Sequence, residues 1–94
     1  MNIDKDIAEL ERITILKTEI VRIDLNFLDK ENLEEIEEIA YDLEIEEYLT
    51  EFNIEDLYNS EYDKLCTIYK QWYNDILNAF ENINNKINKR LNEN

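Results

Sequence analysis

The chain has 94 residues, a net charge of −14, 44% hydrophobic residues and no His, Gly or Pro. This length corresponds to one domain, and the hydrophobic content suffices for a core. Without His the usual general base and zinc ligand are missing, and without Gly the standard phosphate-binding and EF-hand loops are excluded.

The first segment, residues 4–28, supports two interpretations. Its apolar residues recur at spacings of three and four, at Ile13, Leu16, Ile20, Ile23 and Phe27. This pattern is typical of a helix that packs on other helices. Residues 21–27 instead alternate apolar and polar side chains, and residues 13–23 are rich in β-branched types, which favours a strand. We favour the helix, because a hairpin would turn at Lys17-Thr18-Glu19, a poor turn sequence. The alternative is an α+β fold with a short β-hairpin around residues 12–27.

Residues 29–32 form a link, and Asn32 with Glu35 is the expected capping pair of the next helix. Two apolar stripes follow. The first comprises Leu33, Ile36, Ile39, Ala40 and Leu43, and the second comprises Ile45, Tyr48, Leu49 and Phe52. On a straight helix the two stripes lie on nearly opposite sides. We therefore expect a break near residues 42–44; the alternative is one helix that keeps a stripe for a partner.

A short segment over residues 54–58 precedes the last helix and is bracketed by two cap-like pairs. These pairs are Asn53 with Asp56 and Ser60 with Asp63. The last helix has the clearest periodicity, with apolar residues at Leu65, Tyr69, Trp72, Ile76, Phe80, Ile83, Ile87 and Leu91. We expect Cys66 in its apolar stripe to be core, and the Asn-rich end from Asn82, above all residues 88–94, to fray. The predicted fold is all-α: residues 1–94 form a small antiparallel helical bundle with a long C-terminal helix.

The negative charge is concentrated in one third of the chain. Residues 1–30 carry seven acids and five bases, and residues 64–94 carry three acids and five bases. Residues 31–63, the acidic segment, carry fourteen acids and no base. Like charges at i, i+4 on a helix cost about 0.2–0.5 kcal/mol per pair. The acidic segment contains several such pairs, including Glu34 with Glu38, so a role other than helix stability is indicated.

The charge spacing is close to that of a nucleic-acid backbone. Residues 33–52 contain nine acids. As a helix they would span about 30 Å, or about one charge per 3.3 Å, against about 3.4 Å per phosphate on one DNA strand. We therefore predict a partner-binding surface, with Tyr48 and Tyr58 as aromatic anchors or, alternatively, core residues. Its predicted residues are Glu34, Glu35, Glu37, Glu38, Asp42, Glu44, Glu46, Glu47, Tyr48, Glu51, Glu55, Asp56 and Tyr58.

In size, acidity and lack of motifs, the chain resembles the small acidic proteins by which phages and mobile elements disable host defence, such as anti-CRISPR and anti-restriction DNA mimics. The resemblance implies an inhibitor of a nucleic-acid-binding host protein, a nuclease such as a CRISPR effector or a restriction enzyme. It would occupy the basic DNA or RNA groove as a phosphate-backbone mimic, with groove Lys and Arg paired to Glu and Asp.

The composition also makes several other functions and locations unfavourable. We expect no enzymatic activity, cofactor or metal, because di-iron sites in helical bundles need His. The net charge of −14 disfavours direct binding to nucleic acid or to an anionic membrane. The single Cys and the acidic N-terminal residues indicate the cytoplasm. The alternative function is a helical interaction module, an antitoxin, an immunity protein or a dimeric structural protein, whose acidic face is merely solvated.

Overall fold

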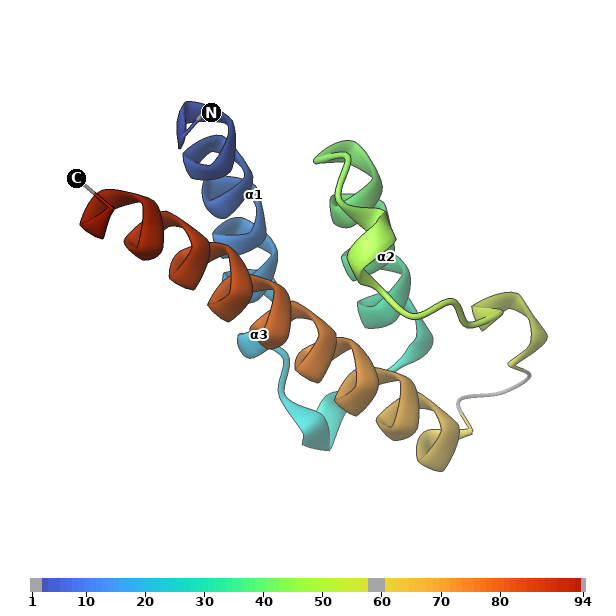
Figure 1. Ribbon diagram of the computed structural model, residues 1–94. Coiled ribbons are helices and arrows are strands. Elements are labelled where there is room, and N and C mark those ends of the chain that lie inside the picture. Colours follow the sequence, from blue (N-terminus) through green and yellow to red (C-terminus); the bar gives the residue numbers. More distant parts are fainter. Residues whose placement is uncertain (1–2, 58–60, 94) are drawn as a thin grey trace.

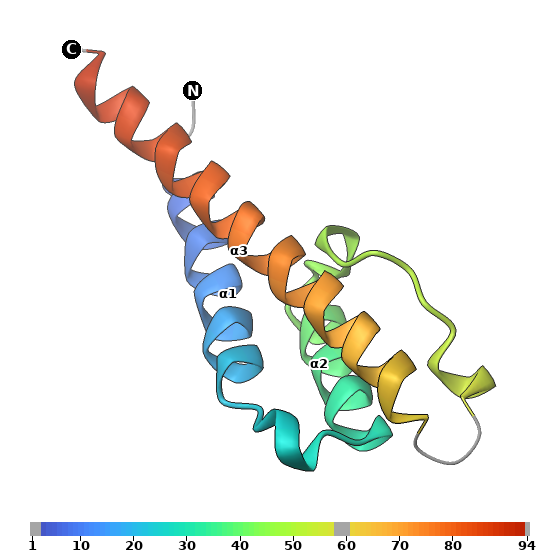
Figure 2. The same cartoon turned by 90° about the horizontal axis from the view of Figure 1, so that it is seen from below.

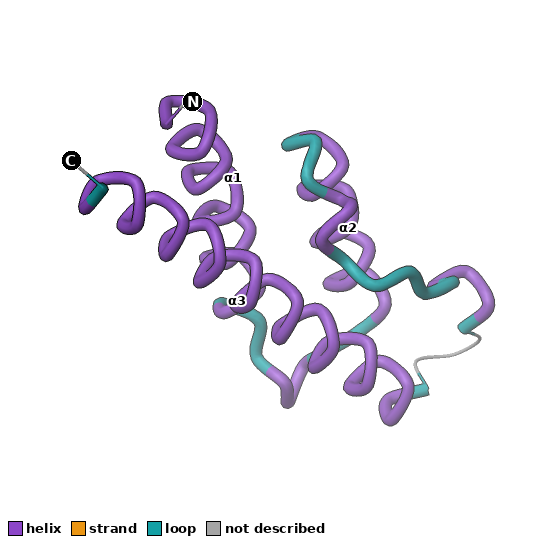
Figure 3. Tube along the Cα trace, in the orientation of Figure 1, coloured by secondary structure: helices purple, strands orange, loops and turns teal. Residues whose placement is uncertain are grey.

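The computed structural model describes residues 3–57 and 61–93. Its three α-helices are α1 (Ile3–Val21), α2 (Lys30–Asp42) and α3 (Tyr62–Asn92) (Figures 1 and 3). Short 3₁₀ turns form η1 (Leu25–Phe27), η2 (Glu46–Tyr48) and η3 (Ile54–Asp56). The described residues contain no strand. The prediction of an all-α bundle with a long C-terminal helix is therefore confirmed, and the hairpin around residues 12–27 is wrong.

Both other helices pack against the long helix α3. The molecule is elongated, with dimensions of 54 × 21 × 18 Å. α1 runs antiparallel along the C-terminal half of α3, and α2 lies beside its N-terminal half (Figures 1 and 2). The core lies between the three helices. Its fully buried side chains include Ile13, Leu16, Ile20, Leu33, Ile36, Ile45, Leu65, Trp72 and Ile76. The acidic segment therefore flanks α3, and its Tyr48 reaches Glu9 of α1.

Burial explains why α1 is a helix despite its β-branched residues. Its helical stripe packs against α3, where the Tyr69 hydroxyl donates to the carbonyl of Ile20 at 3.1 Å. The helix stops at Val21, and the side chain of Asp24 caps η1 by accepting the Asn26 N–H at 2.9 Å. Phe27, which was expected on the buried seam, is 79% exposed. The chain has left the helix before Phe27, so helical spacing no longer decides which side is buried.

The N-cap of α2 is Asp29, three residues before the predicted Asn32. The Asp29 carboxylate accepts the Asn32 N–H, and the Asn32 side-chain oxygen accepts the Asp29 N–H, both at 2.9 Å. This reciprocal pair is a capping box in which an amide takes the place of Glu or Gln. The cap prediction was wrong because Asp29 and Asn32 are both suitable capping residues, and only their mutual contact decides between them.

The break between the two apolar stripes is confirmed at Asp42, where α2 ends. Glu44 adopts a positive φ of 59°, a conformation usually taken by Gly after a helix. The N–H groups of Glu44 and Ile45 donate to the carbonyls of Tyr41 at 3.0 Å and Ala40 at 2.9 Å, the Schellman pattern. Burial of Ile45 stabilises this ending. A single acidic helix over residues 33–52 is therefore wrong.

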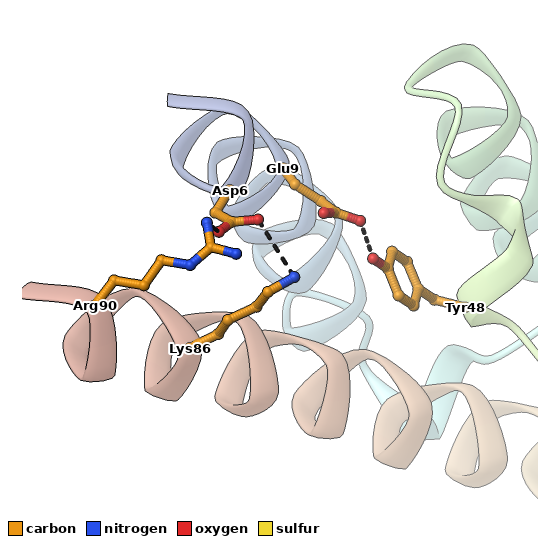
Figure 4. Close-up of polar contacts among 5 residues, drawn as sticks. All are labelled: Asp6, Glu9, Tyr48, Lys86 and Arg90. Carbon is orange, nitrogen blue, oxygen red and sulfur yellow. Dashed lines mark hydrogen bonds and ion pairs between the residues drawn. The ribbon is translucent and has the colours of Figure 1, made fainter. Parts of the chain in front are cut away.

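α3 is helical through Asn92, including the Asn-rich end from Asn82 and the part of the tail over residues 88–94 that lies within the helix, for which fraying was predicted. Ile83 and Ile87 are buried. In addition, the buried carboxylate of Asp6 forms ion pairs with Lys86, at 3.5 Å, and with Arg90 (Figure 4). These contacts with α1 outweigh the weak helix propensity of Asn.

Asp6→Asn is expected to loosen the end of α3 and to lower the free energy of unfolding by about 1–3 kcal/mol, because Arg90 loses its charged acceptor. Hydrogen exchange of the backbone amides over residues 83–92 should accelerate. Asp4→Asn, a change of the same type at an exposed position, is the control and should leave this exchange unchanged. Equal exchange in the Asp6 variant and the unmodified protein would contradict a role of the ion pairs.

Candidate protein-binding surface

Every carboxylate predicted to bind a partner is exposed. These residues are Glu34, Glu35, Glu37, Glu38, Asp42, Glu44, Glu46, Glu47, Glu51, Glu55 and Asp56. They come from α2, η2, η3 and the links between them. Within residues 3–57 and 61–93, only Glu34 of this set forms an ion pair, with Lys30 at 3.7 Å. The fold thus leaves the acidic surface nearly uncompensated.

Glu46, Glu47 and Glu51 belong to a loop, residues 46–53, that hydrogen bonds tie to the neighbouring helices. The Tyr48 hydroxyl donates to Glu9 of α1 (Figure 4). Trp72 Nε1 donates to the carbonyl of Thr50 at 2.7 Å, and the Thr50 N–H donates to Asp75 Oδ2 at 2.8 Å. Since these bonds join the loop to both α1 and α3, its acids hold defined positions without a regular helix.

The predicted aromatic anchors lie in different surroundings. Tyr48 is half-buried, packs against the core and bonds Glu9, so much of its ring serves the fold. Tyr58 lies outside the described residues. The prediction omitted Tyr41, which is 66% exposed on α2. Its position off the buried stripe of α2 was the sequence signal for this exposure.

A groove of about 960 Å³ opens between α2 and residues 46–53. Its acidic lining residues are Glu37, Glu46, Glu47 and Glu51, and its apolar ones are Leu49, Phe52 and Trp72. Phe52 meets Trp72 edge-on, with ring centroids 6.5 Å apart. The sequence predicted these acids as binding residues but not the groove, which exists only because residues 46–53 lie against α2 and α3.

Glu37 lies near carboxylates from other parts of the acidic segment. Partial burial raises the pKa of Glu37 above its ordinary value of 4.5, and the nearby charges of Glu34, Glu46 and Glu55 raise it further. Glu46 and Glu55 belong to η2 and η3, so the fold brings together acids from three elements. Nevertheless, no three metal-binding side chains among the described residues are close enough to hold a metal ion. The arrangement suits a partner whose positive charges are spread over an area.

Stability is expected to rise as the pH falls from 7 toward 5. The pKa of Glu37 is higher in the folded protein than in the unfolded chain, so the folded state binds the proton more tightly. The gain appears as the pH falls through the raised folded value and is complete below about 4.5. Thermal melts at constant ionic strength measure it. Glu37→Gln should be more stable than the unmodified protein at pH 7 and should not gain this stability as the pH falls. A melting temperature of the unmodified protein that falls steadily from pH 7 to 5 contradicts the expectation.

Across the described parts of the chain, no helix contains an apolar stretch suited to crossing a lipid bilayer. Comparison of the chain with family models, curated proteins and solved structures finds no match.

Proposed function

We propose that the chain is an acidic binding protein that inhibits a nucleic-acid-binding protein, a nuclease such as a CRISPR effector or a restriction enzyme. It occupies the basic groove of that nuclease in place of a phosphate backbone. The supporting observation is the set of eleven exposed carboxylates, of which one forms an ion pair among the described residues. Such a surface attracts a basic partner over a distance and pairs with its Lys and Arg side chains on contact.

The bend at Glu44 gives the acidic surface breadth. α2 contributes one set of acids, and η2 and η3, which contact α2, contribute a second set beside it. A duplex likewise presents its phosphates along two backbones. A basic groove that accepts a duplex would therefore contact acids on both parts of this surface. This supports mimicry although residues 33–52 do not form one continuous helix.

Nuclease capture and inhibition test this proposal. The immobilised protein is exposed to lysates of nuclease-containing cells at low and high salt, and cleavage of duplex DNA by each captured nuclease is measured with and without the protein. We expect capture that is lost at high salt, because screening weakens exposed charge pairs, and inhibited cleavage. The protein alone should give no discrete gel-shift complex with DNA or RNA. Unaffected cleavage by every captured nuclease, or a discrete complex with nucleic acid at moderate salt, contradicts the proposal.

A second candidate is a helical interaction module. Ile7, Ile15 and Val21 of α1 are exposed, which favours association through an apolar helix face. Such an interface persists when salt is raised, whereas contacts of the acidic surface weaken. Sedimentation at low and high salt therefore separates the two candidates: a self-associated species that persists at high salt favours the module.

A further inference from the structure

We infer that the groove between α2 and residues 46–53 receives an arginine-bearing segment of the partner protein. The inference rests on the proposed function and states where, and through which side chain, the acidic surface recognises its partner. Its basis is the combination of an acidic lining, an apolar lining and a fixed loop in one concave site.

The carboxylates that line the groove favour a positively charged ligand. Glu37, Glu46 and Glu51 line the groove from two separate segments, and none of them forms an ion pair within residues 3–57 and 61–93. Phosphate groups are repelled from such a site. A single metal ion does not fit either, because no three ligating side chains among the described residues converge. A flat, extended cation can pair with two carboxylates that line one groove.

The apolar lining favours arginine among the biological cations. Leu49 and Phe52 lie beside the carboxylates, with Trp72 behind Phe52. An arginine side chain has an apolar stem that covers such a surface, and its planar guanidinium stacks on aromatic rings and pairs with carboxylates through two parallel hydrogen bonds. The compact, strongly hydrated ammonium of lysine matches the site less well.

The groove is preformed in the free protein. Thr50, in the middle of the loop, is fixed by both its backbone groups, to Trp72 and to Asp75. Trp72 is 1% exposed, so its position is also set by the core. A binding site that is already ordered loses little conformational entropy when a partner segment enters, and this improves affinity.

Titration with a short peptide that alternates arginine and serine tests the inference, with calorimetry for affinity and Trp72 fluorescence for location. The matched lysine peptide and spermidine serve as comparison ligands. The groove variant combines Glu37→Gln, Glu46→Gln and Glu51→Gln. The control variant combines Glu31→Gln, Glu35→Gln and Glu38→Gln, which are exposed and outside the groove. Both variants change the net charge by three.

We expect the arginine peptide to shift the Trp72 emission and to bind the groove variant about tenfold more weakly than the unmodified protein. The control variant should bind within about twofold, and the lysine peptide more weakly than the arginine peptide. Absent binding, equal losses in both variants, or spermidine binding as tight as that of the arginine peptide overturns the inference.

Failure of the inference and failure of the proposed function are distinguishable. If both triple variants lose affinity for the peptide and for the partner protein alike, the groove is not a specific site, but the acidic surface still binds the partner. If the arginine peptide binds in the groove while duplex DNA does not compete for the partner protein, the proposed mimicry fails alone.

Discussion

Reversal of charge in the acidic segment is expected to abolish partner binding. The variant replaces five exposed residues by Lys, namely Glu34, Glu37, Glu38, Glu44 and Glu47. Against a basic groove, attraction becomes repulsion, and the new like-charge contacts cost on the order of several kcal/mol together. The steering field that speeds association is lost as well. Affinity for the partner, measured at fixed ionic strength, should fall below detection.

The fold should survive this change. Glu and Lys have similar helix propensities, and replacing Glu37 removes its repulsion from Glu46 and Glu55. Among the described residues, the ion pair lost is that between Lys30 and Glu34, which is exposed and worth at most about 1 kcal/mol. Circular dichroism should therefore show unchanged helical content, so the loss of binding can be assigned to the surface.

A charge-matched pair of variants separates position from net charge. One variant carries Gln at the same five acidic positions. The other carries Lys at five positions of α3: Asn82, Asn84, Asn85, Asn88 and Asn92. Each of the two raises the net charge by five, from −14 to −9. The Gln variant should lose most of its affinity and the α3 variant should keep it. Equal losses would show that only net charge matters, and no loss in either would place the interface elsewhere.

Trp72→Ala is expected to lower the free energy of unfolding by about 3–5 kcal/mol. Trp72 is among the largest fully buried side chains, packs edge-on against Phe52 and donates a hydrogen bond to Thr50. Removal of the indole leaves a cavity beneath residues 46–53. It also leaves the Thr50 carbonyl without its hydrogen-bond donor. A domain of this size has a total stability of about 5–15 kcal/mol, so the variant loses a large fraction of it.

Urea denaturation measures this loss, and Trp72→Phe provides the graded comparison. Phe retains most of the apolar volume but not the hydrogen bond to Thr50, so it should cost about 1–2 kcal/mol. The emission of Trp72 in the unmodified protein should be that of a buried indole. Emission typical of a fully solvated indole, or a cost for Ala no larger than for Phe, would contradict the core position.

Apolar spacing predicted the fold well wherever burial decides the structure. The stripe of α3 is buried from Leu65 to Ile87 apart from the half-buried Phe80, and the conflict between two stripes correctly placed the break after Asp42. Apolar spacing no longer predicts burial beyond the part of each helix that packs on the core. Phe27 lies past the end of α1, and Leu91 is 59% exposed near the end of α3, so both are exposed although they continue the pattern.

The candidate site could be predicted only in part. The acids could be identified because residues 31–63 contain no Lys or Arg to compensate them. Charged side chains are also normally exposed. The groove could not be predicted, because it depends on contacts between distant residues. Trp72 and Thr50 are 22 positions apart, and Tyr48 and Glu9 are 39 apart. No local pattern encodes such pairs, so the sequence could not decide whether Tyr48 is an anchor or a core residue.

Competition with duplex DNA tests most directly whether the acidic surface occupies a nucleic-acid groove. The apparent Kd of the chain for its purified partner is measured at constant ionic strength while the DNA concentration is raised. Mutually exclusive binding predicts that the apparent Kd rises in proportion to the DNA concentration once the groove is saturated with DNA. An apparent Kd that does not change with DNA, with a ternary complex of chain, partner and DNA, would contradict the mimicry.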